Sequence, residues 1–129
     1  MKNFKSLIAL LLVSYIGFAQ SGPKISIQKN ENTIDYGKIN KSTDNGIRNF
    51  TITNTGDAPL NILGIQTTAS FVILHKPNNS IAPGKSETIE IKYNMVPGPI
   101  RKTITLETNA VNYDGGRVPL KIKGEVLTN

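Results

Sequence analysis

Alternation of apolar and polar residues runs through most of this sequence, and it constrains the fold more than any other feature. Residues 88–93 show it clearly, because Ile89, Ile91 and Tyr93 are separated by polar side chains. A period of two places one face of a β-strand in a core and the other face in water. Together with short apolar runs, this period predicts seven or eight strands, within residues 24–28, 34–36, 46–54, 60–65, 71–74, 88–93, 100–108 and 118–126.

Two of the predicted strands are more continuously apolar than the others. Residues 60–65 read LNILGI and residues 71–74 read FVIL, with little polar alternation. Because strands covered on both faces have such runs, we expect both segments to be buried on both sides. In the alternating strands, the inward side chains are expected at Ile25, Ile27, Phe50, Ile52, Ile104, Leu106, Val118, Leu120, Ile122 and Val126.

Turn-forming residues separate the predicted strands. Pro83-Gly84 suits the central positions of a type II turn, because proline fixes φ and glycine accepts a positive φ. Asp114-Gly115 is typical of a hairpin. Gly56, within the turn sequence NTGDAP at 54–59, is expected in the left-handed conformation. Pro59 lacks an amide hydrogen and is expected at a strand start or an edge.

These features predict an all-β domain. No segment of ten or more residues after residue 19 has the spacing of an amphipathic helix. Seven or eight short strands in about 110 residues predict an immunoglobulin-like antiparallel β-sandwich. A barrel is the alternative, which strand spacing alone does not separate from a sandwich. The tryptophan and paired cysteines of antibody domains are absent, since the chain has neither residue type.

The N-terminal segment has the features of a signal peptide. Lys2 and Lys5 precede an apolar run that ends at Gly17-Phe18-Ala19, with small residues at the positions that signal peptidase reads. The run is short for a membrane span, which needs about 20 apolar residues. We therefore expect a signal peptide helix at residues 1–19 that is cleaved, and a single domain at residues 20–129. An uncleaved anchor is the alternative. A cleaved signal peptide predicts a periplasmic, secreted or cell-surface protein.

The amino-acid composition of the chain argues against several classes of function. Without Lys2 and Lys5, 13 of the 15 basic residues remain against 9 acidic residues, a net charge of +4. These bases are scattered and do not interleave with aromatic residues, so nucleic-acid binding is not expected. The absence of cysteine excludes a lipid-anchored lipoprotein, thiol catalysis, disulfides and thiolate metal sites.

Several motifs occur in an order that resembles a known family. They lie at residues 35–39 (DYGKI), 50–60 (FTITNTGDAPL), 81–86 (IAPGKS), 93–94 (YN), 97–98 (PG), 105–110 (TLETNA) and 122–124 (IKG). With them, residues 25–126 resemble the bacterial domain-of-unknown-function family 1573, which is similar to the ASH (Hydin-like) and major-sperm-protein domains. The resemblance implies an immunoglobulin-like sandwich, exported by a Gram-negative bacterium and without an established activity. Related domains mostly mediate protein–protein contact.

One segment departs from the family pattern. Many members carry a cysteine, often within Gly-Cys-Thr, ahead of the Ile-Ala-Pro-Gly motif. Here residues 64–74 read GIQTTASFVIL and contain no cysteine. Any thiol or metal chemistry of those members is therefore not available to this chain.

Two local motifs have a chemical interpretation that the surrounding sequence does not support. His75 is the only histidine and is expected at the surface, at the end of the strand at 71–74. A Ser-His-Asp arrangement through it would lack a nucleophile elbow. Gly84-Lys85-Ser86 resembles the end of a phosphate-binding loop. However, Asn79 stands where that loop has a glycine, and a strand rather than a helix is expected to follow.

The carboxylates also have structural explanations. Those considered as acid–base pairs are Glu87, Glu90, Glu107 and Glu125. The last three are expected on the outward faces of strands, where each cross-strand ion pair contributes roughly 0.2–1 kcal/mol. The segments at 44–46 (DNG) and 114–116 (DGG) lack the spaced acids of a calcium loop and are expected to form turns.

The sequence therefore predicts no catalytic, cofactor-binding or metal-binding residue, no cofactor and no enzymatic activity. We expect an exported protein-interaction module of the bacterial envelope, whose free sheet edges accept a strand of another envelope or periplasmic protein. One alternative is a structural or chaperone-like accessory subunit of a surface assembly. Another is a hydrolase or carbohydrate-binding domain with an unrecognised pocket. Neither a nucleic-acid partner nor a membrane span after signal cleavage is expected.

Overall fold

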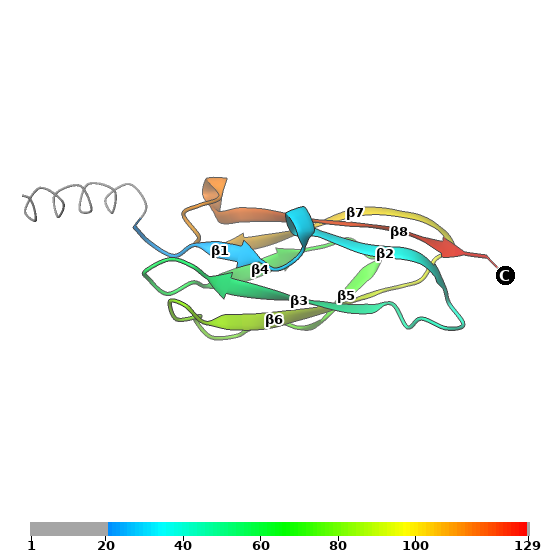
Figure 1. Cartoon of the computed structure of the whole chain (residues 1–129), viewed down its shortest axis with the longest axis horizontal. Coiled ribbons are helices and arrows are strands. Elements are labelled where there is room, and N and C mark those ends of the chain that lie inside the picture. The colour runs from blue at the N-terminus through cyan, green and yellow to red at the C-terminus, as the bar shows by residue number, and fades with distance from the viewer. Residues whose placement is uncertain (1–20, 129) are drawn as a thin grey trace, which may run out of the picture.

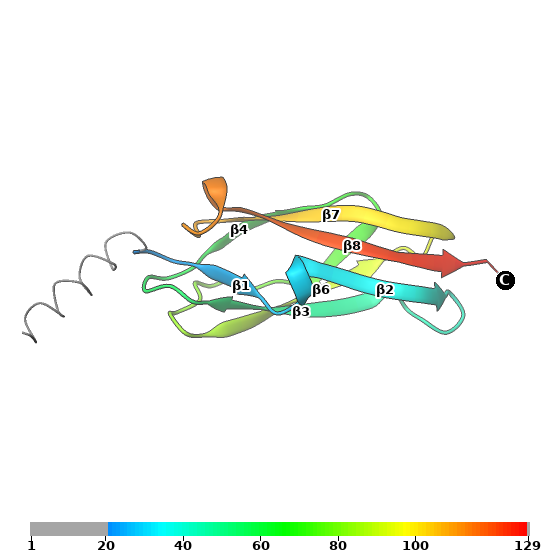
Figure 2. The ribbon, with the colours of Figure 1, turned by 45° about the horizontal axis from the view of Figure 1, so that its top comes forward.

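The computed structural model describes residues 21–128, which form eight β-strands in two four-stranded sheets (Figures 1 and 2). Two 3₁₀ turns, η1 (Asn30–Asn32) and η2 (Asp114–Gly116), precede β2 and β8. The expected signal peptide, and both end residues of the expected domain, lie outside the described residues. Between residues 21 and 128, no helix is long and apolar enough to cross a membrane. The strands are β1 (Ile25–Ile27), β2 (Thr33–Asn40), β3 (Ile47–Asn54), β4 (Ile62–Gln66), β5 (Phe71–His75), β6 (Ser86–Tyr93), β7 (Gly98–Thr108) and β8 (Arg117–Leu127).

The two sheets form a sandwich, which confirms the predicted fold and excludes the barrel. The first sheet has the order β1-β3-β6-β5 and the second has the order β2-β8-β7-β4. Neighbouring strands are antiparallel except for β2 and β8, which run parallel. The arrows of β1 and β2 point the same way in both views, because the chain changes sheets at η1 without reversing (Figures 1 and 2). The alternation of the sequence did not predict this parallel pair.

The inner faces of both sheets share one apolar core. Every inward residue expected from the alternation is buried, including Phe50 and Ile52 in β3 and Ile104 and Leu106 in β7. Such burial stabilises a fold by roughly 25 cal/mol per Å² of apolar surface removed from water. Since the chain has no cysteine, it holds its sheets together by this packing and by hydrogen bonds.

The expectation that the two continuously apolar segments are covered on both faces is wrong. Leu63 in β4 is 69% exposed, and Val72 and Leu74 in β5 are 58% and 43% exposed. The reason is the two-layer architecture, because every strand of a sandwich has one face in the core and no further layer of the described chain covers the outer faces of β4 and β5. In β4 a register shift between Ile62 and Gly64 contains Leu63.

The turn sequence NTGDAP connects β3 of the first sheet to β4 of the second, so it carries the chain across the sandwich. The left-handed conformation expected for Gly56 is wrong, since Gly56 is not among the described glycines with positive φ. Glycine is required for space instead. A Cβ atom at residue 56 would lie 2.6 Å from the Lys24 amide nitrogen and collide with the Gly22 carbonyl oxygen.

The turn predictions for Pro83-Gly84 and Asp114-Gly115 are confirmed. Gly84 has a φ of 80°, and the Lys85 amide donates a hydrogen bond of 3.0 Å to the Ala82 carbonyl, as a type II turn requires. Asp114-Gly115 lies in the connection of the antiparallel pair β7–β8, so the hairpin is present.

Candidate functional site

The residues considered as chemical candidates lie at or near the surface, and two of them, His75 and Glu87, line one open hollow. His75 is exposed at the end of β5, in register with Glu90 of β6. The segment at 84–86 forms the turn into β6, with no helix after it. Glu107 accepts hydrogen bonds from Arg117 and Gln66 on the neighbouring strands. In the part of the chain that the structure describes, no three His, Cys, Asp or Glu side chains gather closely enough to hold a metal ion.

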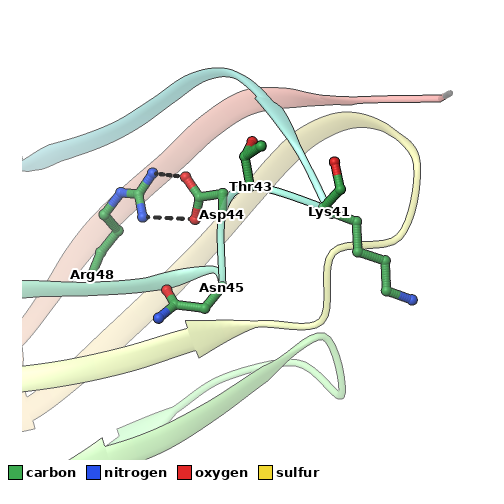
Figure 3. A pocket seen from close by; sticks show the side chains of 6 residues that line it. Lys41, Thr43, Asp44, Asn45 and Arg48 are labelled. Atoms are coloured by element: carbon green, nitrogen blue, oxygen red, sulfur yellow. Dashed lines mark hydrogen bonds and ion pairs between the residues drawn. The ribbon is translucent and has the colours of Figure 1, made fainter.

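One polar cluster lies at the β2–β3 connection, beside an open hollow of about 500 Å³ lined by Lys41, Ser42, Thr43, Asp44, Asn45 and Arg48 (Figure 3). Both carboxylate oxygens of Asp44 accept hydrogen bonds from the Arg48 guanidinium, at 3.1 and 2.8 Å. The guanidinium carbon lies 4.3 Å from the ring centre of Tyr36. The Tyr36 hydroxyl donates a 2.8 Å hydrogen bond to the Gly46 carbonyl, so four residues fix one corner.

The ionisation of this corner does not suit acid–base chemistry. The hydrogen bonds from Arg48 lower the pKa of Asp44, and the same bonds raise the pKa of Arg48. Burial raises the pKa of Tyr36 to about 12. All three groups therefore keep their ordinary charge near neutral pH, whereas a catalytic acid or base needs a pKa near the working pH. The corner orders the connection and fixes the entry into β3.

A different region is left without partners: the side of the sandwich formed by β4 and β5, the edge strands of the two sheets. We call it the open side and define it by β4, β5 and the connection between them. Three of the five exposed large apolar side chains of the described chain, Leu63, Val72 and Leu74, belong to it. No Asp, Glu, Lys or Arg occurs between Asp57 and Lys76, so the open side carries no formal charge.

The opposite side of the sandwich protects its edges. The Asn112 side chain accepts a hydrogen bond from the Ile25 amide and donates one to the Ile25 carbonyl, both of 3.0 Å, which occupies the main chain of β1. On β2, Asp35 and Lys38 flank a register shift against β8. Charges and bulges of this kind discourage the addition of another strand.

The edge of β5 has neither kind of protection along most of its length. It pairs with β6 alone, and no side chain of a described residue forms a hydrogen bond with its main chain. Its only irregularity is a register shift between Ile73 and His75. An exposed, uncharged, apolar edge strand is a ready template for pairing with another chain. The sequence contained a signal for this region, the long uncharged stretch with two apolar runs, but runs of that kind are also typical of a buried strand.

Comparison with known families gives one match over most of the chain. The family model described as "Protein of unknown function (DUF1573)" matches residues 27–126, which confirms the resemblance in the sequence motifs. A comparison with curated proteins gives no significant match.

Solved structures show the same fold. A protein of unknown function from Porphyromonas gingivalis W83 has a TM-score of 0.65 and 20% identity, with 83% of this chain and 48% of that chain covered. The chain thus spans about half of that protein. The ASH/PapD-like domain 7 of human CEP192 has a TM-score of 0.54 and 11% identity, with 82% of this chain and 87% of that chain covered. The YadV chaperone has a TM-score of 0.53 and 16% identity, with 80% of this chain and 52% of that chain covered. At these identities the likeness establishes the fold alone.

Proposed function

Since the chain belongs to the family of proteins of unknown function DUF1573, with an immunoglobulin-like and PapD-like sandwich, we propose that it is an exported, non-catalytic protein-interaction module of the bacterial envelope. The signal peptide features at residues 1–19 support export. The scattered carboxylates and the single exposed histidine support a non-catalytic role, because they form no constellation of nucleophile, base and orienting group.

The observation that carries the proposal is the open side. A partner strand that adds to β5 would form main-chain hydrogen bonds along an edge that the described chain leaves unpaired. Val72 and Leu74 project from the outer face of β5 and would be shielded from water in the same event. Backbone pairing supplies affinity in this binding mode, and the pockets for alternate side chains supply specificity.

A chaperone-like or structural accessory subunit of a surface assembly is the second candidate. It is favoured by the fold shared with the YadV chaperone and by the uncharged edge, which presents no repulsion to a second copy of the chain. In that case the strand that pairs with β5 belongs to an assembly subunit or to another copy.

The test changes the β5 edge and nothing in the core. Val72→Glu places a carboxylate at an exposed position whose cross-strand neighbour is Lys92, so the change is compatible with folding. The matched control is Thr88→Glu, an exposed position on the central strand β6 of the same sheet. Tagged wild type and both variants are incubated with native envelope extract, and the captured proteins are quantified by mass spectrometry.

We expect one reproducible partner that wild type and Thr88→Glu capture and that Val72→Glu loses by about tenfold, because a charge on an edge strand discourages pairing and the apolar contact of Val72 is lost. Capture of the chain's own second copy, with the same dependence on Val72, would favour the accessory-subunit candidate. Equal capture by all three proteins would exclude the β5 edge, and an absence of any captured protein would count against an interaction module.

A further inference from the structure

A second surface, separate from the open side, lies on the outer face of the second sheet. We call it the basic face and define it by Arg101 of β7 and Lys121 and Lys123 of β8. These three residues line a shallow hollow of about 480 Å³, together with Glu31, Thr33, Lys102, Thr103 and Ile122. The cations outnumber the acids, which are Glu31 in the hollow and Asp35 beside it.

The strand register places like charges against one another on this face. Arg101 lies directly opposite Lys123, and Lys121 lies opposite Thr103, two pairs further along the same two strands and on the same face. Like charges directly opposite one another destabilise a sheet. Lys123 has one acidic neighbour, Asp35, at 3.9 Å, and both side chains are more than half exposed. Arg101 and Lys121 form no ion pair with any described residue.

Another arginine on the same two strands has hydrogen-bonding partners. Arg117 on β8 lies opposite Glu107 on β7, and its guanidinium donates hydrogen bonds to Glu107 at 3.2 Å and to Gln66 at 3.1 Å. Gln66 in turn donates to Glu107 at 2.8 Å. The second sheet therefore contains a satisfied polar network at one end and, in its middle, a cluster of cations in which Arg101 and Lys121 have no acidic partner. The stability of the fold does not explain this cluster.

We propose that the basic face binds an acidic segment of a partner polypeptide, rich in Asp and Glu. Carboxylates from that segment would supply the anions that Arg101 and Lys121 lack, and an arginine guanidinium can hold a carboxylate with two hydrogen bonds. Thr103 lines the same hollow and adds a hydroxyl donor. Since the face is open and shallow, an extended segment fits it better than a compact ligand does.

The chemistry of the face disfavours other anionic partners. Adsorption to a membrane combines cations with apolar side chains that enter the lipid, and none of the exposed large apolar side chains lines this hollow. Binding to single-stranded nucleic acid uses aromatic side chains for base stacking, and the lining contains none.

The proposal is tested by binding of the purified protein to poly-L-glutamate, measured by calorimetry at low salt. The variant is Arg101→Gln with Lys121→Gln. The matched control is Lys76→Gln with Lys85→Gln, which removes two exposed lysines at other places and changes the net charge equally. We expect the first variant to weaken binding by roughly tenfold and to lower its salt dependence, as the loss of two charge-assisted contacts implies. The control should bind within about twofold of wild type.

Folding is monitored in the same preparations. Because Arg101 faces Lys123, the unfolding midpoint of the variant should equal or exceed that of wild type. Equal weakening by variant and control would overturn the proposal, since net charge alone would then explain binding. The proposal would also be overturned by a complete lack of saturable binding. Tighter binding to heparin, or to vesicles of phosphatidylglycerol, than to poly-L-glutamate would overturn the choice of a polypeptide.

Discussion

At the scale of single residues, hydrogen bonds from the turn NTGDAP hold the segment that precedes β1 in place. The Asn54 side chain is completely buried, and it donates 2.8 Å hydrogen bonds to the carbonyls of Ala58 and Ile81 while its oxygen accepts the Gly56 amide at 2.9 Å. Asp57 accepts a hydrogen bond from the Gly22 amide at 2.7 Å. The turn therefore joins three separate segments, and its side chains do more than reverse the chain.

The contrast between Gly56 and Gly84 gives a prediction for stability. At Gly56 an added Cβ meets the main chain of residues 22–24, so Gly56→Ala should lower the free energy of unfolding by about 1–3 kcal/mol through overpacking. At Gly84 there is open space but a positive φ, so Gly84→Ala should cost about 1 kcal/mol through backbone strain. Urea denaturation measures both changes.

Substitution by asparagine distinguishes backbone strain from overpacking as the cause of the lost stability. It tolerates the left-handed conformation better than alanine does, so Gly84→Asn should restore part of the stability lost in Gly84→Ala. At Gly56 the larger side chain meets the same obstruction, and Gly56→Asn should be no better than Gly56→Ala. Recovery of stability by asparagine at Gly56 would show that φ, and not space, requires the glycine there.

At the scale of elements, the sequence predicted the strands and their inner faces because both depend on local order along the chain. Burial of Phe50 or Ile104 follows from a period of two. Whether the second face of a strand is covered depends on whether another layer of the protein packs on it, and the direction of each pair depends on which strands become neighbours. The exposure of Leu63 and Val72 follows from the two-layer arrangement, and the parallel pair β2–β8 follows from the strand order; no residue pattern within a single strand encodes either.

The connection between β2 and β3 gives a prediction for pH dependence. Arg48 lowers the pKa of Asp44, so the pair stabilises the fold fully above the ordinary aspartate pKa of 3.8, and this stabilisation is lost as the pH falls through the lowered value. Asp44→Asn should lower the free energy of unfolding at neutral pH by about 0.5–1 kcal/mol, since both side chains are partly exposed.

The difference between wild type and Asp44→Asn should shrink as the pH is lowered below 3.8, which urea unfolding at neutral and acidic pH can measure. Asp35→Asn is the control, because the exposed pair of Asp35 with Lys123 should contribute little at any pH. A difference that stays constant from neutral to acidic pH would mean that the Asp44 carboxylate does not act through its charge.

At the scale of the whole molecule, one side of the sandwich has edge strands that are protected against pairing with another chain, and the other side does not. The edges at β1 and β2 are occupied by Asn112 or interrupted by charge and a register shift, whereas the open side has neither feature along most of β5. The basic face lies on the outside of the second sheet, away from the β5 edge of the first. The candidate surface was not predictable from the sequence in detail, because an apolar run has the same appearance in a buried strand and in an open edge.

The most direct test of the account is hydrogen–deuterium exchange of the protein alone and bound to the partner that wild type captures. Amides in β5 (Phe71–His75) should exchange more slowly in the complex, because a new strand would pair with that edge, while the exchange of β1 and β2 should stay unchanged. Protection of β1 or β2, with β5 unaffected, would contradict the account and place the partner on the opposite side of the sandwich.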